Sequence, residues 1–247
     1  MKIIISPAKK MRQEVAGIDA LSKPVFLKQT RQLSDYLKTL TLPELKKLLA
    51  CNDQLAALNY ERFQHMDLNQ IGEPALWMYE GIQYRYMAVN VFDDAQIAYA
   101  QEHLRILSGF YGVLKPMDGI VPYRLEMQAK LKTDFCENLY DFWKDALYEE
   151  LSKDKELILN LASEEYSRCI SHYRKEPIRL IQVIFGEEQT DGSIKEKGVY
   201  AKMARGEMVR YLCEHQIDSP DEIKAFDRLH YHYDEKRSNE QTYVFVR

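Results

Sequence analysis

Lys202 and Arg205 stand three residues apart in a segment, 201–215, whose apolar spacing predicts a helix. At about 100° per residue, both cations fall on the same side of that helix as Val209 and Leu212. A cation does not remain in a core without an anionic partner. We therefore expect Lys202 and Arg205 to emerge at the margin of the core and to face a cleft, where they could bind an anion.

A second pair of cations, Lys9 and Lys10, follows the β-branched run Lys2–Ile5, which predicts a buried strand. Ser6 and Pro7 should end this strand, because proline has no N–H for the ladder. Residues just beyond the C-terminal end of a buried strand commonly face the ligand crevice of an α/β sheet. Ser6, Lys9 and Lys10 are thus candidates for the same cleft, and an ordinary solvated loop is the alternative.

Glu164 and Glu165 are the candidate acid–base residues. They follow an expected strand at 157–161, and Ser163 is placed to cap a helix that begins with them. Beside a positive cleft they could transfer protons. They could instead form ion pairs with Lys202 and Arg205, or stabilise the helix dipole, which is the commonest role of acidic residues in a first turn.

The segment Leu107–Met127 concentrates glycine, proline and cations, with three of the ten glycines of the chain. Gly109 and Gly112 follow an expected helix, and a glycine hairpin of this kind can hold DNA phosphates through backbone N–H groups, as in helix-hairpin-helix modules. The two glycines are three residues apart rather than two, and Pro116 limits any second helix. A plain helix end followed by a turn is the alternative.

His230, His232 and Asp234 would share one face of a strand by period-two alternation and could ligate a metal. An exposed strand with alternating polar residues gives the same pattern, so we predict no metal site. The sequence contains no Ser-His-Asp order, Walker loop or dinucleotide fingerprint.

Composition restricts the class of protein. Hydrophobic residues make up 46% of the 247 residues, enough for a large core, and the net charge of −4 means that any anion site must be local. The four cysteines are far apart, which indicates reduced thiols rather than a disulfide framework. No apolar run is long enough for a signal peptide or a membrane span, so we expect a cytosolic protein without a membrane partner.

The order of expected elements predicts the fold class. Helices dominate the first half, with a capping box at Thr41–Glu44 and a cap at Asn52, and a further helix runs from Asp93 towards Gly109. Strands are more frequent in the second half. The expected strands there are 157–161, 178–185, 194–199 and 242–246. The expected helices there are 139–151, 201–215 and a short helix after Ser219. We expect one mixed α/β domain over residues 1–247.

Seven collinear segments resemble the YaaA family of bacterial peroxide-stress proteins. They span nearly the whole chain and are Ile5–Lys9, Leu55–Phe63, Leu104–Pro116, Pro122–Met127, Leu139–Trp143, Asn160–Tyr166 and Tyr200–Gly206. The resemblance implies a cytosolic protein of the oxidative-stress response that limits damage linked to free iron, with an α/β architecture called the cantaloupe fold.

The resemblance also implies binding of duplex or junction DNA through a positive cleft and a helix-hairpin-helix element. It implies no particular catalytic reaction, and we expect no cofactor. Carried onto this chain, the candidate DNA-binding residues are Lys9, Arg105, Gly109, Gly112, Lys115, Arg124, Lys202 and Arg205. The chain departs from the family where relatives have a Gly-Asp pair followed by Val-Tyr, because it reads Gly81-Ile82-Gln83-Tyr84. If that acid is catalytic in relatives, this member lacks the activity.

Two hypotheses follow. The leading one is a DNA-binding protein of the peroxide response. The rival is an enzyme acting on a phosphorylated or nucleotide-like small molecule, held by Lys9, Lys202 and Arg205 with Glu164 or Glu165 in acid–base work.

Overall fold

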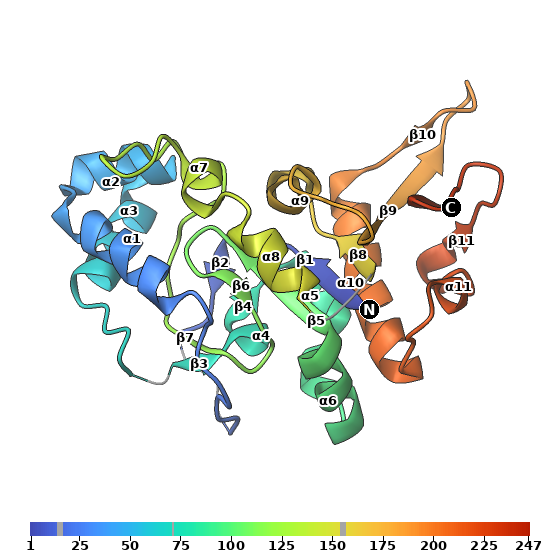
Figure 1. Cartoon of the computed structure of the whole chain (residues 1–247), viewed down its shortest axis with the longest axis horizontal. Coiled ribbons are helices and arrows are strands. Elements are labelled where there is room, and N and C mark those ends of the chain that lie inside the picture. The colour runs from blue at the N-terminus through green and yellow to red at the C-terminus, as the bar shows by residue number, and fades with distance from the viewer. Residues whose placement is uncertain (14–16, 71, 154–156) are drawn as a thin grey trace.

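The computed structural model describes residues 1–13, 17–70, 72–153 and 157–247, and its centre is an eight-stranded, mostly parallel sheet (Figure 1). Its path is β11-β12-β9-β8-β1-β5-β6, with β10 paired to β9. The strands are β1 (Lys2–Ile5), β5 (Leu104–Ser108), β6 (Gly112–Leu114), β8 (Leu157–Leu161), β9 (Arg179–Glu188), β10 (Ile194–Lys195), β11 (His232–Tyr233) and β12 (Thr242–Val246). The mixed α/β class predicted from the sequence is confirmed.

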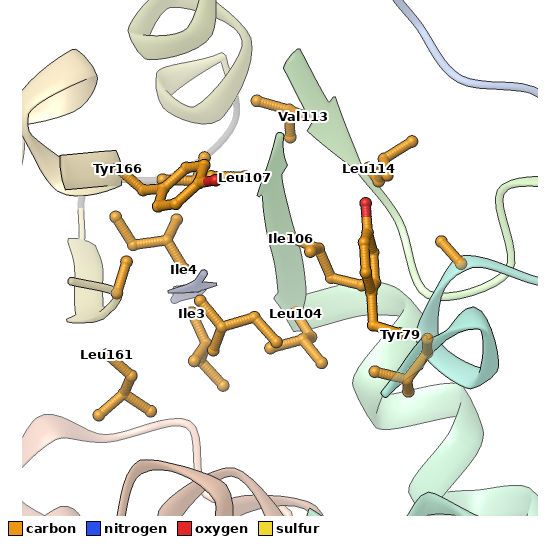
Figure 2. Packing of buried hydrophobic residues seen from close by; sticks show 14 of the residues in the cluster. Ile3, Ile4, Tyr79, Leu104, Ile106, Leu107, Val113, Leu114, Leu161 and Tyr166 are labelled. Carbon is orange, nitrogen blue, oxygen red and sulfur yellow. The ribbon is translucent and has the colours of Figure 1, made fainter. Parts of the chain in front are cut away.

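The inner strand β1 is apolar along its whole length because both of its faces are buried. Ile3 pairs in register with Leu104 of β5, and Ile3, Ile4 and Ile5 are fully buried. Figure 2 shows Ile3 and Leu104 on one side of the sheet and Ile4 on the other, towards Tyr166. Side chains alternate across a strand, so a central strand covered on both sides reads as a continuous apolar run.

Helices cover both faces of this sheet. One face carries α8 (Ala146–Ser152) and α9 (Glu164–Ser171), and the other carries α6 (Asp94–His103) and α10 (Gly198–His215), with α5 (Ile82–Met87) packed on α10 (Figures 1 and 2). The α5–α10 contact is close because Gly206 has no side chain: a Cβ there would lie 2.2 Å from the Gln83 carbonyl oxygen. This glycine sets the spacing of two helices that both reach the site described below.

A helical lobe lies to one side of the sheet, at the left of Figure 1. It contains α1 (Leu27–Thr39), α2 (Leu42–Leu49) and α3 (Asp53–Gln64). The predicted capping box is present at Thr41 and Glu44, and the Asn52 side chain caps α3. Leu45 is buried as its spacing suggests, whereas Leu55 and Leu58, which the same spacing would place in the core, are exposed.

Short elements connect these parts. Two ribbons pair β2 (Lys10–Met11) with β4 (Tyr79–Glu80) and β3 (Glu73–Pro74) with β7 (Gly119–Ile120). The remaining helices are α4 (Ala75–Met78), α7 (Leu139–Trp143), α11 (Pro220–Ile223), η1 (Val89–Val91) and η2 (Arg228–His230). None of the helices in the described part of the chain is long and apolar enough to cross a membrane.

The helix expected to run from Asp93 towards Gly109 ends earlier, at His103. Residues 104–108 form β5 instead. A turn then leads into β6, which pairs with β5 in antiparallel orientation, with Ser108 opposite Gly112. The segment around Gly109 and Gly112 is therefore a β-hairpin, and the helix-hairpin-helix prediction for it is wrong. Pairing with β1 buries Leu104 and Ile106 completely, and this non-local burial overrides the helical spacing.

Candidate functional site

A cavity of about 320 Å³ opens at the C-terminal ends of β1 and β8, and we call it the central cavity. β1 and β8 are parallel neighbours; the chain leaves β1 through residues 6–9 into β2, and it leaves β8 through Ala162 and Ser163 into α9. Open α/β sheets commonly bind ligands in a crevice at the carboxyl ends of their strands. The lining residues are Ser6–Lys10, Glu80–Tyr84, Tyr123–Glu126, Ser163, Glu165, Tyr166, Lys202 and Arg205.

Two serines join the two strand ends at this cavity. The backbone N–H of Ser163 donates a 2.8 Å hydrogen bond to Ser6 Oγ, and the two hydroxyl oxygens lie 3.1 Å apart. The Tyr84 hydroxyl donates to the Ser6 carbonyl oxygen at 2.9 Å. Three elements that are distant along the chain thus share hydrogen bonds at one corner of the cavity.

Five cations expected at the cleft line this cavity together: Lys9, Lys10, Arg124, Lys202 and Arg205. Arg124 and Lys9 both contact Glu126, at 2.8 Å and 2.5 Å. Arg205, on α10, is 9% exposed and lies 3.3 Å from Glu196. Lys202, one turn before it, is exposed and has no ion-pair partner among the residues that the structure describes.

Three buried donors around the central cavity have no hydrogen-bond partner in the described part of the chain. They are Gln83 Nε2, Arg124 Nε and Arg205 Nε, and all three residues line the cavity. A buried donor without an acceptor is costly, by about 1–3 kcal/mol. Because none of the three atoms can accept a hydrogen bond, a ligand that satisfied them would have to present acceptor oxygens, as a phosphate or carboxylate does.

Acidic residues share the lining and reduce its charge. Five cationic and three acidic side chains line the cavity, an excess of two positive charges, so it is less basic than a wholly cationic cleft. Glu165 is half-buried; burial raises the pKa of its carboxyl, nearby Glu126 adds to the rise, and the Gln128 N–H and Lys9 oppose it. A carboxyl with a raised pKa beside a cation is suited to carry a proton.

The sequence model of the peroxide stress protein YaaA family matches residues 1–237 of this chain. A UPF0246 protein of Desulfitobacterium hafniense is 54% identical over 247 residues, covering 100% of this chain and 98% of that protein. UPF0246 proteins of Lachnoclostridium phytofermentans and Pediococcus pentosaceus are 52% and 50% identical over all of this chain and 96% and 98% of their own lengths.

The chain belongs to the YaaA family of peroxide stress proteins. The segments that resembled this family in the sequence include both strand ends at the central cavity, Ile5–Lys9 and Asn160–Tyr166, and the turn that carries Arg124. The family assignment drawn from those segments is therefore confirmed.

Other residues proposed for DNA binding from the YaaA resemblance lie outside the lining of this cavity. Arg105 is buried, and its guanidinium donates to the carbonyl oxygens of Gln101 and Leu104 at 3.0 Å and 2.7 Å. Lys115 is exposed beyond β6. Arg105 therefore has backbone acceptors of its own, and neither cation faces the central cavity.

The two hairpin glycines are packing positions. A Cβ on Gly109 would lie 2.7 Å from the Leu125 carbonyl oxygen. Gly112 has φ of +77° and faces Trp143, which would be 3.0 Å from an added Cβ. Trp143 in turn donates its Nε1–H to the Gly109 carbonyl oxygen at 3.0 Å. The backbone of this hairpin is enclosed by side chains of the chain itself.

The structure also gives the positions of the candidate acid–base residues and of the possible metal ligands. Glu164 is exposed and outside the lining, so of the two candidate acid–base residues only Glu165 faces the cavity. His230 lies in η2 rather than on the strand with His232, and Asp234 is paired with Arg237. The described residues contain no group of three or more His, Cys, Asp or Glu placed to hold a metal ion.

Gln83 and Tyr123 are cavity residues that sequence reasoning did not select. Tyr123 is buried and donates to or accepts from both Ser108 and Tyr79, at 2.6 Å and 2.7 Å. Gln83 stands in the tetrapeptide where the chain departs from the family pattern, which was the available signal.

Proposed function

We propose that this protein acts in the cytoplasm during peroxide stress by binding DNA through phosphate groups held in the central cavity. The observation that carries the proposal is the set of three buried donors without partners, Gln83 Nε2, Arg124 Nε and Arg205 Nε, around one cavity. A phosphate offers acceptor oxygens and negative charge together, which matches both the donors and the local excess of cations.

The size of the cavity refines this proposal. A volume of about 320 Å³ is that of a small-ligand pocket, so it suits one nucleotide unit rather than the width of a duplex. Duplex ends and junctions supply such units at low cost, because their nucleotides are less completely stacked and paired. Lys9, Lys10 and Lys202 are exposed at the rim, where they would face neighbouring phosphates. Under this proposal, the protein limits damage linked to free iron on the DNA that it binds.

The test is the affinity for a fluorescent four-way junction, a blunt duplex and a single strand, each titrated at several salt concentrations. We expect log affinity to fall linearly with log salt, with a slope of roughly −2 to −4 for a few neutralised phosphates. The junction should bind more tightly than the interior of a closed circular duplex, which has no ends. A salt-independent affinity, or no binding to any of these DNAs, would contradict the proposal.

A second candidate function is catalysis on a phosphorylated or nucleotide-like small molecule. It is supported by Glu165, which lines the cavity together with the donors that would hold the anion. Burial raises the pKa of this carboxyl, and a carboxyl with a raised pKa is suited to transfer a proton. A thermal-shift panel of nucleotides and sugar phosphates distinguishes the two functions. A ligand that raises the melting temperature of the protein and is consumed by wild-type protein but not by Glu165→Gln would favour the enzyme.

A further inference from the structure

A second cavity, of about 360 Å³, lies next to the central cavity, and we call it the side cavity. Glu80, Gly81 and Tyr84 line both of them, so a single wall separates the two spaces. The other lining residues come from the residue after β2 and from α4, β4, α5 and η1 with the residue between the last two; they are Arg12, Leu76, Trp77, Tyr79, Arg85, Ala88, Val89, Asn90 and Val91.

The side cavity has two cations that are available to a ligand. Arg12 and Arg85 are both exposed, and neither has an ion-pair partner within the described ranges. The acidic residue of the lining, Glu80, lies 2.9 Å from Lys10 and is thereby partly neutralised. The field in this cavity therefore favours an anion.

The same cavity also has an apolar and aromatic wall. Trp77 is 3% exposed, and its Nε1–H has no hydrogen-bond partner in the described part of the chain. Val91, also in the lining, is 67% exposed and adds apolar surface to this wall. A ligand that suited this wall would bring a flat apolar face and an acceptor atom, as a nucleic-acid base does.

We propose that the side cavity binds the next nucleotide of the strand whose phosphate occupies the central cavity. This inference rests on the proposed function. A strand presents phosphates and bases in regular alternation, and the two cavities present cations and apolar walls on either side of Tyr84. The protein then binds a dinucleotide unit as its minimal ligand, with Arg12 and Arg85 contacting the second phosphate and Trp77 lying in the wall that meets the base.

The experiment compares thymidine 5′-monophosphate with the 5′-phosphorylated thymidine dinucleotide by isothermal titration. In wild-type protein the dinucleotide should bind at least tenfold more tightly. The double variant Arg12→Ala/Arg85→Ala should lose that advantage and keep the wild-type affinity for the monophosphate. Because both arginines are exposed, the variant should fold, and the charge-keeping variant Arg12→Lys/Arg85→Lys should retain at least part of the advantage.

Intrinsic fluorescence supplies an independent readout, since the chain has two tryptophans, Trp77 and Trp143. The dinucleotide should change the emission of wild-type protein more than the monophosphate does. In Trp77→Phe the remaining emission comes from Trp143, which is buried at the hairpin, and the change should disappear.

The outcomes separate the two proposals. If the monophosphate binds and Arg205→Ala abolishes that binding, while the dinucleotide gains nothing, the side cavity is not a nucleotide site and only this inference is overturned. Equal losses for both ligands in Arg12→Ala/Arg85→Ala would overturn it as well. If wild-type protein binds neither ligand nor longer DNA, both the inference and the proposed function are wrong.

Discussion

The central cavity and the β5–β6 hairpin contain similar residue types, but they differ in whether the protein itself satisfies their polar groups. Each combines cations with glycines or turns: Lys202 and Arg205 at the cavity, Arg105 and Lys115 near the hairpin. At the hairpin, the guanidinium of Arg105 has carbonyl acceptors and the glycines are enclosed. At the cavity, a buried donor of Arg205 has none. Whether polar groups are already satisfied by the protein distinguishes a packed turn from a ligand site more sharply than residue type does.

The largest effect should come from adding a methyl group to the hairpin. Gly112→Ala should lower the free energy of unfolding by roughly 2–4 kcal/mol, because Gly112 has φ of +77° and an added Cβ would crowd Phe26, Leu147 and Trp143. Urea denaturation measures this loss. Gly192→Ala is the matched control: φ is +80° with no atom within 4 Å, so only the backbone cost of about 1–2 kcal/mol applies.

Gly112→Ala also tests whether the hairpin takes part in DNA binding. DNA affinity of folded Gly112→Ala should equal that of the wild type. A variant of normal stability that had lost DNA binding would show that the hairpin holds phosphate after all.

The second prediction compares two buried arginines. Arg205→Ala should weaken binding of DNA about 10–100-fold, the effect of losing a charged hydrogen bond of about 1.5–3 kcal/mol. Arg105→Ala should leave the dissociation constant within about twofold and should instead destabilise the fold by roughly 1–3 kcal/mol, because the backbone carbonyls of Gln101 and Leu104 lose their donor. Anisotropy titrations and thermal melts of both variants test this; the reverse assignment of effects would invalidate the distinction.

The third prediction concerns pH. Burial raises the pKa of Glu165, so this carboxyl gains a proton at a higher pH than an exposed glutamate does. Protonation removes a negative charge from the cavity. Affinity for a phosphodiester, whose own charge is constant between about pH 5 and 8, should therefore rise several-fold as the pH falls towards this pKa and decrease as the pH rises through it.

Glu165→Gln should bind the same ligand more tightly at pH 7 and with less pH dependence. Glu164→Gln is the matched control, since Glu164 is exposed outside the cavity and should change neither value. Parallel pH profiles for wild-type protein and Glu165→Gln would rule out this carboxyl as the titrating group.

The smallest effect should come from exposed lysines. Lys202→Ala should reduce the salt slope of DNA binding by about one and weaken binding a few-fold, because one phosphate contact is lost at the rim. Lys115→Ala removes an equally exposed lysine beyond β6 and should leave the slope unchanged. A larger change for Lys115 than for Lys202 would mean that DNA follows the hairpin side of the molecule.

Local signals made much of the fold predictable. The apolar runs of β1 and β12, and the caps at Thr41 and Asn52, depend on neighbours within a few residues, and each lies where the sequence places it. β5 was missed because 104–107 continues the three- and four-residue spacing of α6. Only pairing with β1, about a hundred residues away, decides that these residues form a strand.

Local patterns also placed some residues of the central cavity but not others. Lys202 and Arg205 could be placed at a margin from the periodicity of one helix, and Lys9 from the end of one strand. Gln83 could not, because its importance lies in an unpaired atom that is evident only once α5 is packed on α10. Arg105 was expected at the cleft but lies outside the lining of the central cavity. Its guanidinium donates to backbone carbonyl oxygens, and no side-chain pattern in the sequence reveals such acceptors.

Close packing at Gly206 holds α5 and α10 in position beside the central cavity. Gln83 and Arg205 sit on the two helices that this residue allows to touch, with the Gln83 carbonyl 2.2 Å from where a methyl would stand. The helix contact therefore fixes how far apart these two side chains lie. Alanine at position 206 would push α5 and α10 apart, and under the proposed function this would weaken anion binding although Gln83 and Arg205 themselves are unchanged.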